Sequence, residues 1–367
     1  PERPGRGPQS MNGREAHRPR GPFDRTATIV YVATAVPVAP SARAVGAMIA
    51  RACQGMTMRI GRSMTDVVGA TPVVQLRKVV PEGAADVFVK LEWFNPTGSY
   101  KDRMALAMIE QAEQRGDLRP GMTVLEYTAG STGSSLAYVC AVKGYRFKVV
   151  TSDAFAPEKL ATMAALGAEL TIVASVGGKI TPDLTPRMIE AARQLADDPD
   201  VYWTDQLNNA DSIVGYRSVG TELLEQMDRP IDVFCASVGT AGLAMGVSGA
   251  LADGGSAAKV VIFEPSSTPV ISGGDAGSHR VEGIGIGFLP PLLERERYDE
   301  VRTISEADAR VMARRLAAEE GLLAGTSTGM NVLGASQLAS ELGPDGTVVT
   351  VACDTGLKYL AGDLFSG

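Results

Sequence analysis

Hydrophobic and polar residues alternate in short blocks along this chain from Met64 onward. Short apolar runs rich in β-branched residues predict strands, and longer stretches with helical periodicity predict helices between them. Strands and helices follow one another at short spacing, which is typical of parallel sheets connected by crossover helices. The pattern therefore predicts an α/β fold.

The predicted strands cover residues 86–92, 123–127, 147–151, 169–173, 233–236, 259–264 and 347–352. The predicted helices cover residues 101–116, 134–143, 158–166, 186–196, 212–227 and 306–320, with further helices ending at residue 251 and following residue 329. Residues 202–209 are predicted as a connection, and the glycine-rich residues 272–288 show no clear periodicity. We therefore expect two open parallel-sheet α/β domains, over residues 64–211 and 212–367.

Residues 1–63 differ from the rest of the chain. They hold ten arginines against three acidic residues, a net charge of +7, which leaves −14 for the remainder. The arginine-, proline- and glycine-rich start is typical of disorder, and prolines interrupt the only apolar stretch before it could span a membrane. We expect a non-core extension, with Met58 or Met64 as the natural start.

The composition of the chain excludes several classes of function. The net charge of −7 argues against broad nucleic-acid binding. Two histidines, His17 and His279, nearly exclude a histidine-centred triad or a multi-histidine metal site. The four cysteines lack metal-binding or CxxC spacing, and three lie in apolar runs, so we expect buried free thiols in a reducing cytosol. They are Cys53, Cys140, Cys235 and Cys353.

The most unusual segment is Asn95–Arg103, a turn that places Lys101 in the first turn of a helix. A helix N-terminus disfavours a second positive charge, so it lowers the pKa of a lysine there. A neutral amine is what covalent chemistry with a carbonyl group requires. A solvated charged helix start explains this segment equally well when it is considered alone.

Three turns rich in glycine and hydroxyl residues precede helices, at residues 128–133, 239–242 and 325–329. Backbone N–H groups at such helix starts bind anions, and parallel sheets bind ligands at the carboxyl ends of their strands. Each turn alone is an ordinary helix cap. Together with Lys101 and the scarcity of histidine, they favour a phosphorylated aldehyde cofactor held by lysine.

These segments resemble the cysteine synthase/cystathionine β-synthase family of pyridoxal-phosphate enzymes, of fold type II (tryptophan synthase β-like), over residues 65–364. The resemblance implies that Lys101 carries pyridoxal 5′-phosphate as a Schiff base and that Ser327 bonds its pyridine nitrogen. It assigns the phosphate to Gly239, Thr240, Ala241 and Gly242. It assigns the substrate carboxylate to Thr128, Ala129, Thr132 and Gln206, and a mouth loop to residues 283–288.

Three positions depart from the family pattern. Ser131 stands where an asparagine normally donates to the 3′ oxygen of the cofactor. Ala129 stands where a serine hydroxyl normally touches the substrate carboxylate, and Leu243 replaces a threonine. Ser131 is still expected to be a cofactor-binding residue, but it reaches less far than an asparagine.

The resemblance implies a β-replacement on an O-activated L-serine, with sulfide, a thiol or an amine as nucleophile and with Lys101 as the base. It also implies a homodimer acting on a small amino acid. The net charge and the interrupted apolar stretch predict no nucleic-acid and no membrane partner. One alternative is a β-eliminating lyase or a serine/threonine dehydratase. Another is a weakly active homologue that binds a ligand or a partner. A nicotinamide dehydrogenase is disfavoured because the first βα unit lacks a GxGxxG motif.

Overall fold

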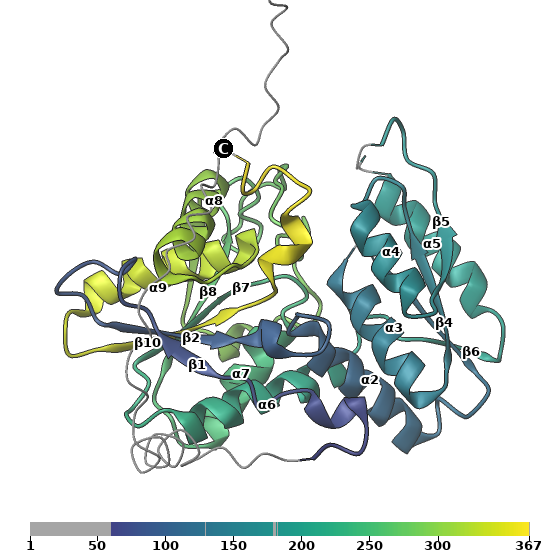
Figure 1. The fold of residues 1–367 in the computed structure, drawn as a ribbon, viewed down its shortest axis with the longest axis horizontal. Coiled ribbons are helices and arrows are strands. Elements are labelled where there is room, and N and C mark those ends of the chain that lie inside the picture. The colour runs from purple at the N-terminus through teal and green to yellow at the C-terminus, as the bar shows by residue number, and fades with distance from the viewer. Residues whose placement is uncertain (1–59, 129, 179–180, 182, 367) are drawn as a thin grey trace, which may run out of the picture. The chain divides into compact units, whose positions relative to one another are not determined.

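Two sheets with helices on both faces make up the described part of the chain (Figure 1). A computed structural model describes residues 60–128, 130–178, 181 and 183–366. Residues 1–59 and Ala129 lie outside the described residues, so the extension predicted for residues 1–63 stays a prediction. No helix in these described ranges is long and apolar enough to cross a membrane.

The larger sheet has six strands in the order β1-β2-β10-β7-β8-β9. The β1–β2 pair is antiparallel, and every other pair in the sheet is parallel. Its strands are β1 (Val73–Gln75), β2 (Asp86–Leu91), β7 (Val233–Ser237), β8 (Lys259–Pro265), β9 (Glu300–Ile304) and β10 (Thr347–Ala352). The helices that pack on it are α6 (Asp211–Gln226), α7 (Gly242–Asp253), α8 (Glu306–Arg315) and α9 (Thr326–Leu342).

The smaller sheet has four parallel strands in the order β5-β4-β3-β6. They are β3 (Thr123–Tyr127), β4 (Arg146–Thr151), β5 (Glu169–Ile172) and β6 (Val201–Trp203). Its helices are α2 (Lys101–Arg115), α3 (Ser131–Lys143), α4 (Pro157–Ala165) and α5 (Leu184–Ala196). Short helical turns complete the described chain: η1 (Met64–Val67), η2 (Glu92–Phe94), η3 (Arg295–Arg297), η4 (Leu316–Glu320) and η5 (Gly356–Tyr359).

The predicted α/β class with parallel sheets is confirmed, and every predicted strand is present within one or two residues. The sequence analysis missed three short strands, β1, β6 and β9, which form because longer strands lie beside them. The helix predicted over 306–320 changes at residue 316 to a π-helical turn. The domain boundary at 211/212 stays a prediction, and β1 and β2 from before it pair in the larger sheet.

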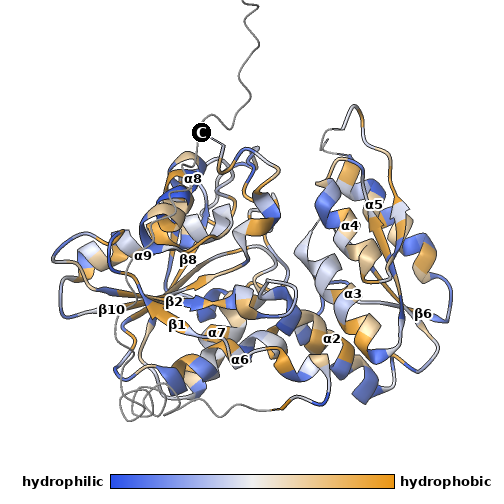
Figure 2. Cartoon of the chain, viewed as in Figure 1, coloured by the Kyte–Doolittle hydropathy of each residue, from blue (hydrophilic) through white to orange (hydrophobic). Residues whose placement is uncertain are grey.

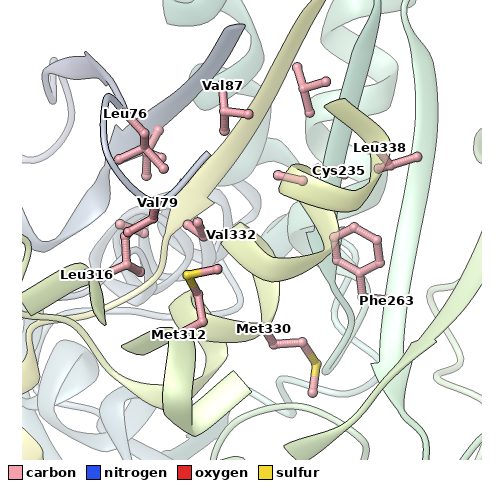
Figure 3. Packing of buried hydrophobic residues seen from close by; sticks show 14 of the residues in the cluster. Leu76, Val79, Val87, Cys235, Phe263, Met312, Leu316, Met330, Val332 and Leu338 are labelled. Atoms are coloured by element: carbon pink, nitrogen blue, oxygen red, sulfur yellow. The ribbon is translucent and has the colours of Figure 1, made fainter. Parts of the chain in front are cut away.

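Neighbouring residues of each central strand serve opposite faces of their sheet. On β10, Val348 packs into the cluster beneath α8 and α9, while Val349 packs into the cluster beneath α6 and α7. Figure 3 shows the first cluster, where Phe263 and Met330 approach from a strand and a helix. Strands that are buried on both faces need continuous apolar runs, which is why the strand signals in the sequence were strong.

The smaller sheet is built on the same plan. Val124 of β3 faces α2 and α3, and the adjacent Leu125 faces α5. Figure 2 shows hydrophobic residues gathered along strands such as β10, and hydrophilic ones on the outer turns of helices. Layers of helix, sheet and helix leave the ends of the strands as the places where polar side chains can gather.

A buried ion network ties α2 to its surroundings. Arg103 Nε and Nη2 donate to the two carboxylate oxygens of Glu92 at 2.7 and 2.8 Å. Its Nη1 and Nη2 donate to Glu222 on α6 at 2.6 and 2.8 Å. Lys90 of β2 adds a third contact, 2.6 Å from Glu222. The network therefore joins α2 to Glu92 and to α6 through the Arg103 guanidinium, and β2 to α6 through the Glu222 carboxylate.

We expect Arg103→Met to lower the free energy of unfolding by about 3–5 kcal/mol, because it leaves the buried Glu92 carboxylate without its cation. Urea unfolding measures this change. The control is Arg187→Met, which removes an exposed ion pair with Asp183 and is expected to cost less than about 1 kcal/mol. Equal losses in the two variants would contradict the role of the network.

The same network predicts a dependence on acid. Burial opposes the charged form of Glu222, but the hydrogen bonds and charge of Arg103 outweigh it and lower the pKa of that carboxyl to about 2. A depressed pKa gives stability that is present above the unfolded value, near 4.5. We expect this contribution to fade between about pH 4.5 and pH 2 in wild type. It should be smaller in Arg103→Met, where Lys90 alone still lowers the pKa of Glu222; unfolding measured at each pH tests this.

Candidate active site

A pocket of about 560 Å³ opens where strands of both sheets end. Residues just beyond β3, β7 and β10 line it, together with the first residue of α2. The sequence-predicted residues that line it are Lys101, Thr128, Ser131, Thr132, Gln206, Thr240 and Ser327. The structure therefore brings together residues that the sequence analysis selected from five separate segments.

Lys101 is buried at the start of α2, with 7% of its surface exposed. Its Nζ lies 4.4 Å from the centre of the Tyr100 ring. Burial lowers the pKa of Lys101 to about 8, against the opposing influence of Cys353 and Asp354. The pKa of Lys101 is lowered, as predicted, but the cause is burial and not the helix N-terminus on which the prediction was based. The neutral form of this amine is therefore more populated near physiological pH than in an exposed lysine.

The turn before α2 holds Lys101 in place. Asp102 accepts hydrogen bonds from the backbone N–H and the hydroxyl of Thr97, at 2.7 and 2.6 Å. The backbone N–H of Tyr100 donates to the carbonyl of Cys353 at 3.0 Å, and that of Thr355 donates to Gly98 at 3.0 Å. These backbone bonds join the lysine turn to the segment that follows β10.

The turn at residues 239–242 contributes Thr240 to the lining of the pocket. Gly239 and Ala241 line a small cavity that also touches Lys101, and a Cβ atom at Gly239 would lie only 2.1 Å from the carbonyl oxygen of Gly283. Ala241 has a φ of 71°, an unusual conformation for a residue with a side chain. Gly242 begins α7 and packs against Tyr216, so it lines neither cavity.

An unpartnered polar atom lies at the same turn. The buried Ser237 hydroxyl has no hydrogen-bond partner among the described residues, and Ser237 lines the small cavity. Backbone N–H groups at the start of α7 have no partners within the helix. A phosphate group at this helix start fits these donors.

The turn after β3 faces the lysine. Thr132 donates from its hydroxyl to Gln206 Oε1 at 2.8 Å, which joins two of the predicted substrate residues. The backbone N–H of Gln206 donates to the buried Glu126 at 2.9 Å. Burial raises the pKa of the Glu126 carboxyl to about 7. Thr128 lines the pocket beside them, and Ala129 lies outside the described residues.

The turn at residues 325–329 begins α9, and its Ser327 is buried at the pocket wall next to Cys353. A backbone bridge joins Ala324 to Thr355, so this turn lies beside the carboxyl end of β10. The glycine-rich segment 283–288 contributes Gly283, Ile284, Ile286 and Phe288 to the lining. Its expected place near the mouth agrees with the exposed side chain of Phe288.

The sequence analysis missed a charged cluster in this pocket. Asp354, buried after β10, accepts a hydrogen bond from Tyr359 at 2.7 Å, and its other oxygen lacks a partner in the described chain. The negative charge of Asp354 favours the protonated form of three lysines: Lys101, Lys159 and Lys358. Burial lowers the pKa of Lys159 to about 8. The position of Asp354 at the end of a predicted strand could have indicated a site residue, because ligands bind at such ends. Lys159 lies in an ordinary amphipathic helix, which gives no such indication.

These observations fit a phosphorylated aldehyde. The pocket offers a partly neutral amine at Lys101, a helix start with a spare hydroxyl at Ser237, and several cations around one buried carboxylate. Among the described residues, no group of histidine, cysteine or acidic side chains has metal-binding geometry.

Comparison with known proteins also indicates a phosphorylated aldehyde cofactor. The family model "Pyridoxal-phosphate dependent enzyme" matches residues 64–354. A cysteine synthase of Staphylococcus aureus (strain N315) is 42% identical over 308 residues, which is 83% of this chain and 97% of that protein.

Two solved structures are similar across the described fold. The cysteine synthase of Entamoeba histolytica has a TM-score of 0.80 and 31% identity, covering 85% of this chain and 93% of that one. O-ureido-L-serine synthase has a TM-score of 0.77 and 34% identity, covering 84% and 96%. The chain therefore belongs to the family of pyridoxal-phosphate dependent enzymes, with the fold type II architecture of the cysteine synthases.

Proposed function

We propose that this protein replaces the β-substituent of an O-activated L-serine, as a cysteine synthase does, with sulfide, a thiol or an amine as the nucleophile. The observation that carries the proposal is the burial of the Lys101 amine opposite the turn formed by Thr128, Ser131 and Thr132. The names of the relatives, a cysteine synthase and an O-ureido-L-serine synthase, support the same reaction class.

Lys101 is proposed to hold the cofactor and then to move the proton at Cα of the substrate. Its low pKa suits both roles, because a neutral amine accepts a proton and an ammonium returns it. Bound pyridoxal phosphate supplies the electron sink that makes this proton acidic. Ser327 is proposed to face the pyridine nitrogen, and Gly239, Thr240, Ala241 and Gly242 to form the phosphate site.

Thr128, Thr132 and Gln206 are proposed to hold the α-carboxylate of the substrate. The bond between Thr132 and Gln206 fixes one hydroxyl and one amide on the same wall of the pocket. Ala129 is proposed to lie at this carboxylate too, without contributing a hydroxyl. This arrangement orients the amino acid so that Cα faces Lys101.

The second candidate is β-elimination, in which water completes the reaction and a 2-oxo acid is released. Ser131 favours this alternative, since it stands where the family usually has an asparagine. A weakly active homologue that binds a ligand or partner is the third candidate, and the low pKa of Lys101 argues against it.

We further propose a cytoplasmic homodimer. The cytoplasmic location is supported by Cys140, Cys235 and Cys353, which are free and buried thiols. The dimer is supported by the resemblance to the cysteine synthase family. The proposed boundaries of its two domains are residues 64–211 and 212–367.

Supplying O-acetyl-L-serine and sulfide to the loaded enzyme is expected to yield cysteine. Without a nucleophile, little pyruvate should form. Lys101→Ala is expected to lose on the order of 10²–10⁴-fold in kcat, because it removes the proton carrier. The control is Lys148→Ala, which removes a partly exposed lysine of β4. Pyruvate at the rate of substrate consumption would favour elimination instead, and activity retained in Lys101→Ala would contradict the assigned role.

Uptake of pyridoxal phosphate by the cofactor-free protein should depend on pH through Lys101. The pKa of this lysine is lowered to about 8, so the neutral amine increases about tenfold per pH unit below that value and levels off above it. Stopped-flow absorbance from pH 6 to pH 10 measures the rate. A rate that keeps rising to pH 10 would mean that the amine titrates like an exposed lysine.

A further inference from the structure

Lys358 contacts Ser131 across a long separation in the chain. It lies in η5, after β10, and its Nζ donates to Ser131 Oγ at 3.2 Å. Ser131 is the first residue of α3 and lines the pocket that contains Lys101. Lys358 is partly buried and is not among the residues that line this pocket. The ammonium group of Lys358 is therefore linked to the pocket by its hydrogen bond to Ser131.

The contact decides which way the hydroxyl points. An ammonium group has donors and no acceptor, so Ser131 Oγ accepts from Lys358. The hydroxyl hydrogen must then point elsewhere, and in the described chain Ser131 Oγ has no other partner. The wall on which it stands also holds Thr128 and Thr132. Because Ser131 lines the pocket, its hydroxyl hydrogen is available to a ligand there, and the positive charge of Lys358 strengthens such a donation.

Charges around Lys358 hold it in this position. Burial lowers the pKa of its ammonium, while Asp354 and Asp102 favour its charged form. Both carboxylates are buried and are themselves fixed, Asp354 by Tyr359 and Asp102 by Thr97. The two acids act on the lysine through their charge, and its hydrogen bond in the described part of the chain is with Ser131.

We propose that Lys358 is a positioning residue that makes Ser131 a donor to the ring oxygen of the bound cofactor. In this chain, the pair performs the task that the resemblance assigns to an asparagine. The inference rests on the proposed function, because it needs pyridoxal phosphate in the pocket. It also explains how a shorter side chain serves at this position: the charge of Lys358 compensates for the amide that Ser131 lacks.

The test is a double-substitution cycle on the loaded enzyme with Lys358→Met, Ser131→Ala and both together. The readout is the ratio of the visible to the near-ultraviolet absorption band of the bound cofactor. A donor at the ring oxygen favours the form in which that oxygen is negative, which absorbs at longer wavelength. Each single change should lower the ratio and weaken cofactor binding by about tenfold. The second change should add little to the first, because both remove one interaction.

Two further variants sharpen the result. Lys143→Met removes an ion pair with Glu113 at the other end of α3 and should leave the ratio unchanged. Ser131→Asn brings an amide donor of its own, so Lys358→Met should change the ratio less in that background. This comparison separates a role toward the cofactor from a general effect on folding.

The outcomes are distinct. If wild type shows no absorption band of bound cofactor, the proposed function fails. If wild type shows the band and Lys358→Met leaves both the ratio and the affinity unchanged, the inference is overturned. Additive effects of Ser131→Ala and Lys358→Met would also overturn it, since the two side chains would then act independently.

Discussion

The structure depends on the first turn of α2, residues 101–103, where three consecutive side chains have different partners. Arg103 points into the buried ion network and fixes α2 to η2 and α6. Asp102 closes the preceding turn by accepting two hydrogen bonds from Thr97. With its neighbours fixed, Lys101 is held buried at the pocket. A lysine that could swing into water would regain its ordinary pKa, so the chemistry depends on this anchoring.

The second constraint is backbone pairing at the end of β10. The chain beyond this strand bonds to the lysine turn through Tyr100 and Gly98, and Ala324 pairs with Thr355. Strand ends in a parallel sheet cannot continue their own ladder, so their backbone groups are available to neighbouring loops. Here they join three segments that are far apart in the sequence. The convergence of Lys101, Ser327 and Asp354 follows from these bonds.

Sequence patterns predicted much of the fold because the central strands are buried on both faces. Continuous apolar runs such as Val233–Ser237 leave few alternatives, whereas the three-residue strands β1 and β6 are defined by their partners. The hydroxyl-rich turns were visible for a similar local reason, since glycine and hydroxyl residues mark helix starts. No local sequence pattern indicated that Lys159 and Lys358 belong to the site. Their roles come from tertiary contacts with Glu282 and Ser131.

Anionic ligands would balance the positive charges of this pocket. Lys101 and Lys159 are buried, and burial lowers the pKa of both toward 8. The charge of Asp354 acts on both ammonium groups, and Lys159 also forms an ion pair with Glu282. Burial raises the pKa of the Asp354 carboxyl. Removing a charge from water is costly unless it is paired, so a pocket with excess cations gains most from anionic ligands. A phosphate and a carboxylate supply those anions. Their binding then stabilises the fold as well, because any ligand that favours the native state shifts the unfolding equilibrium.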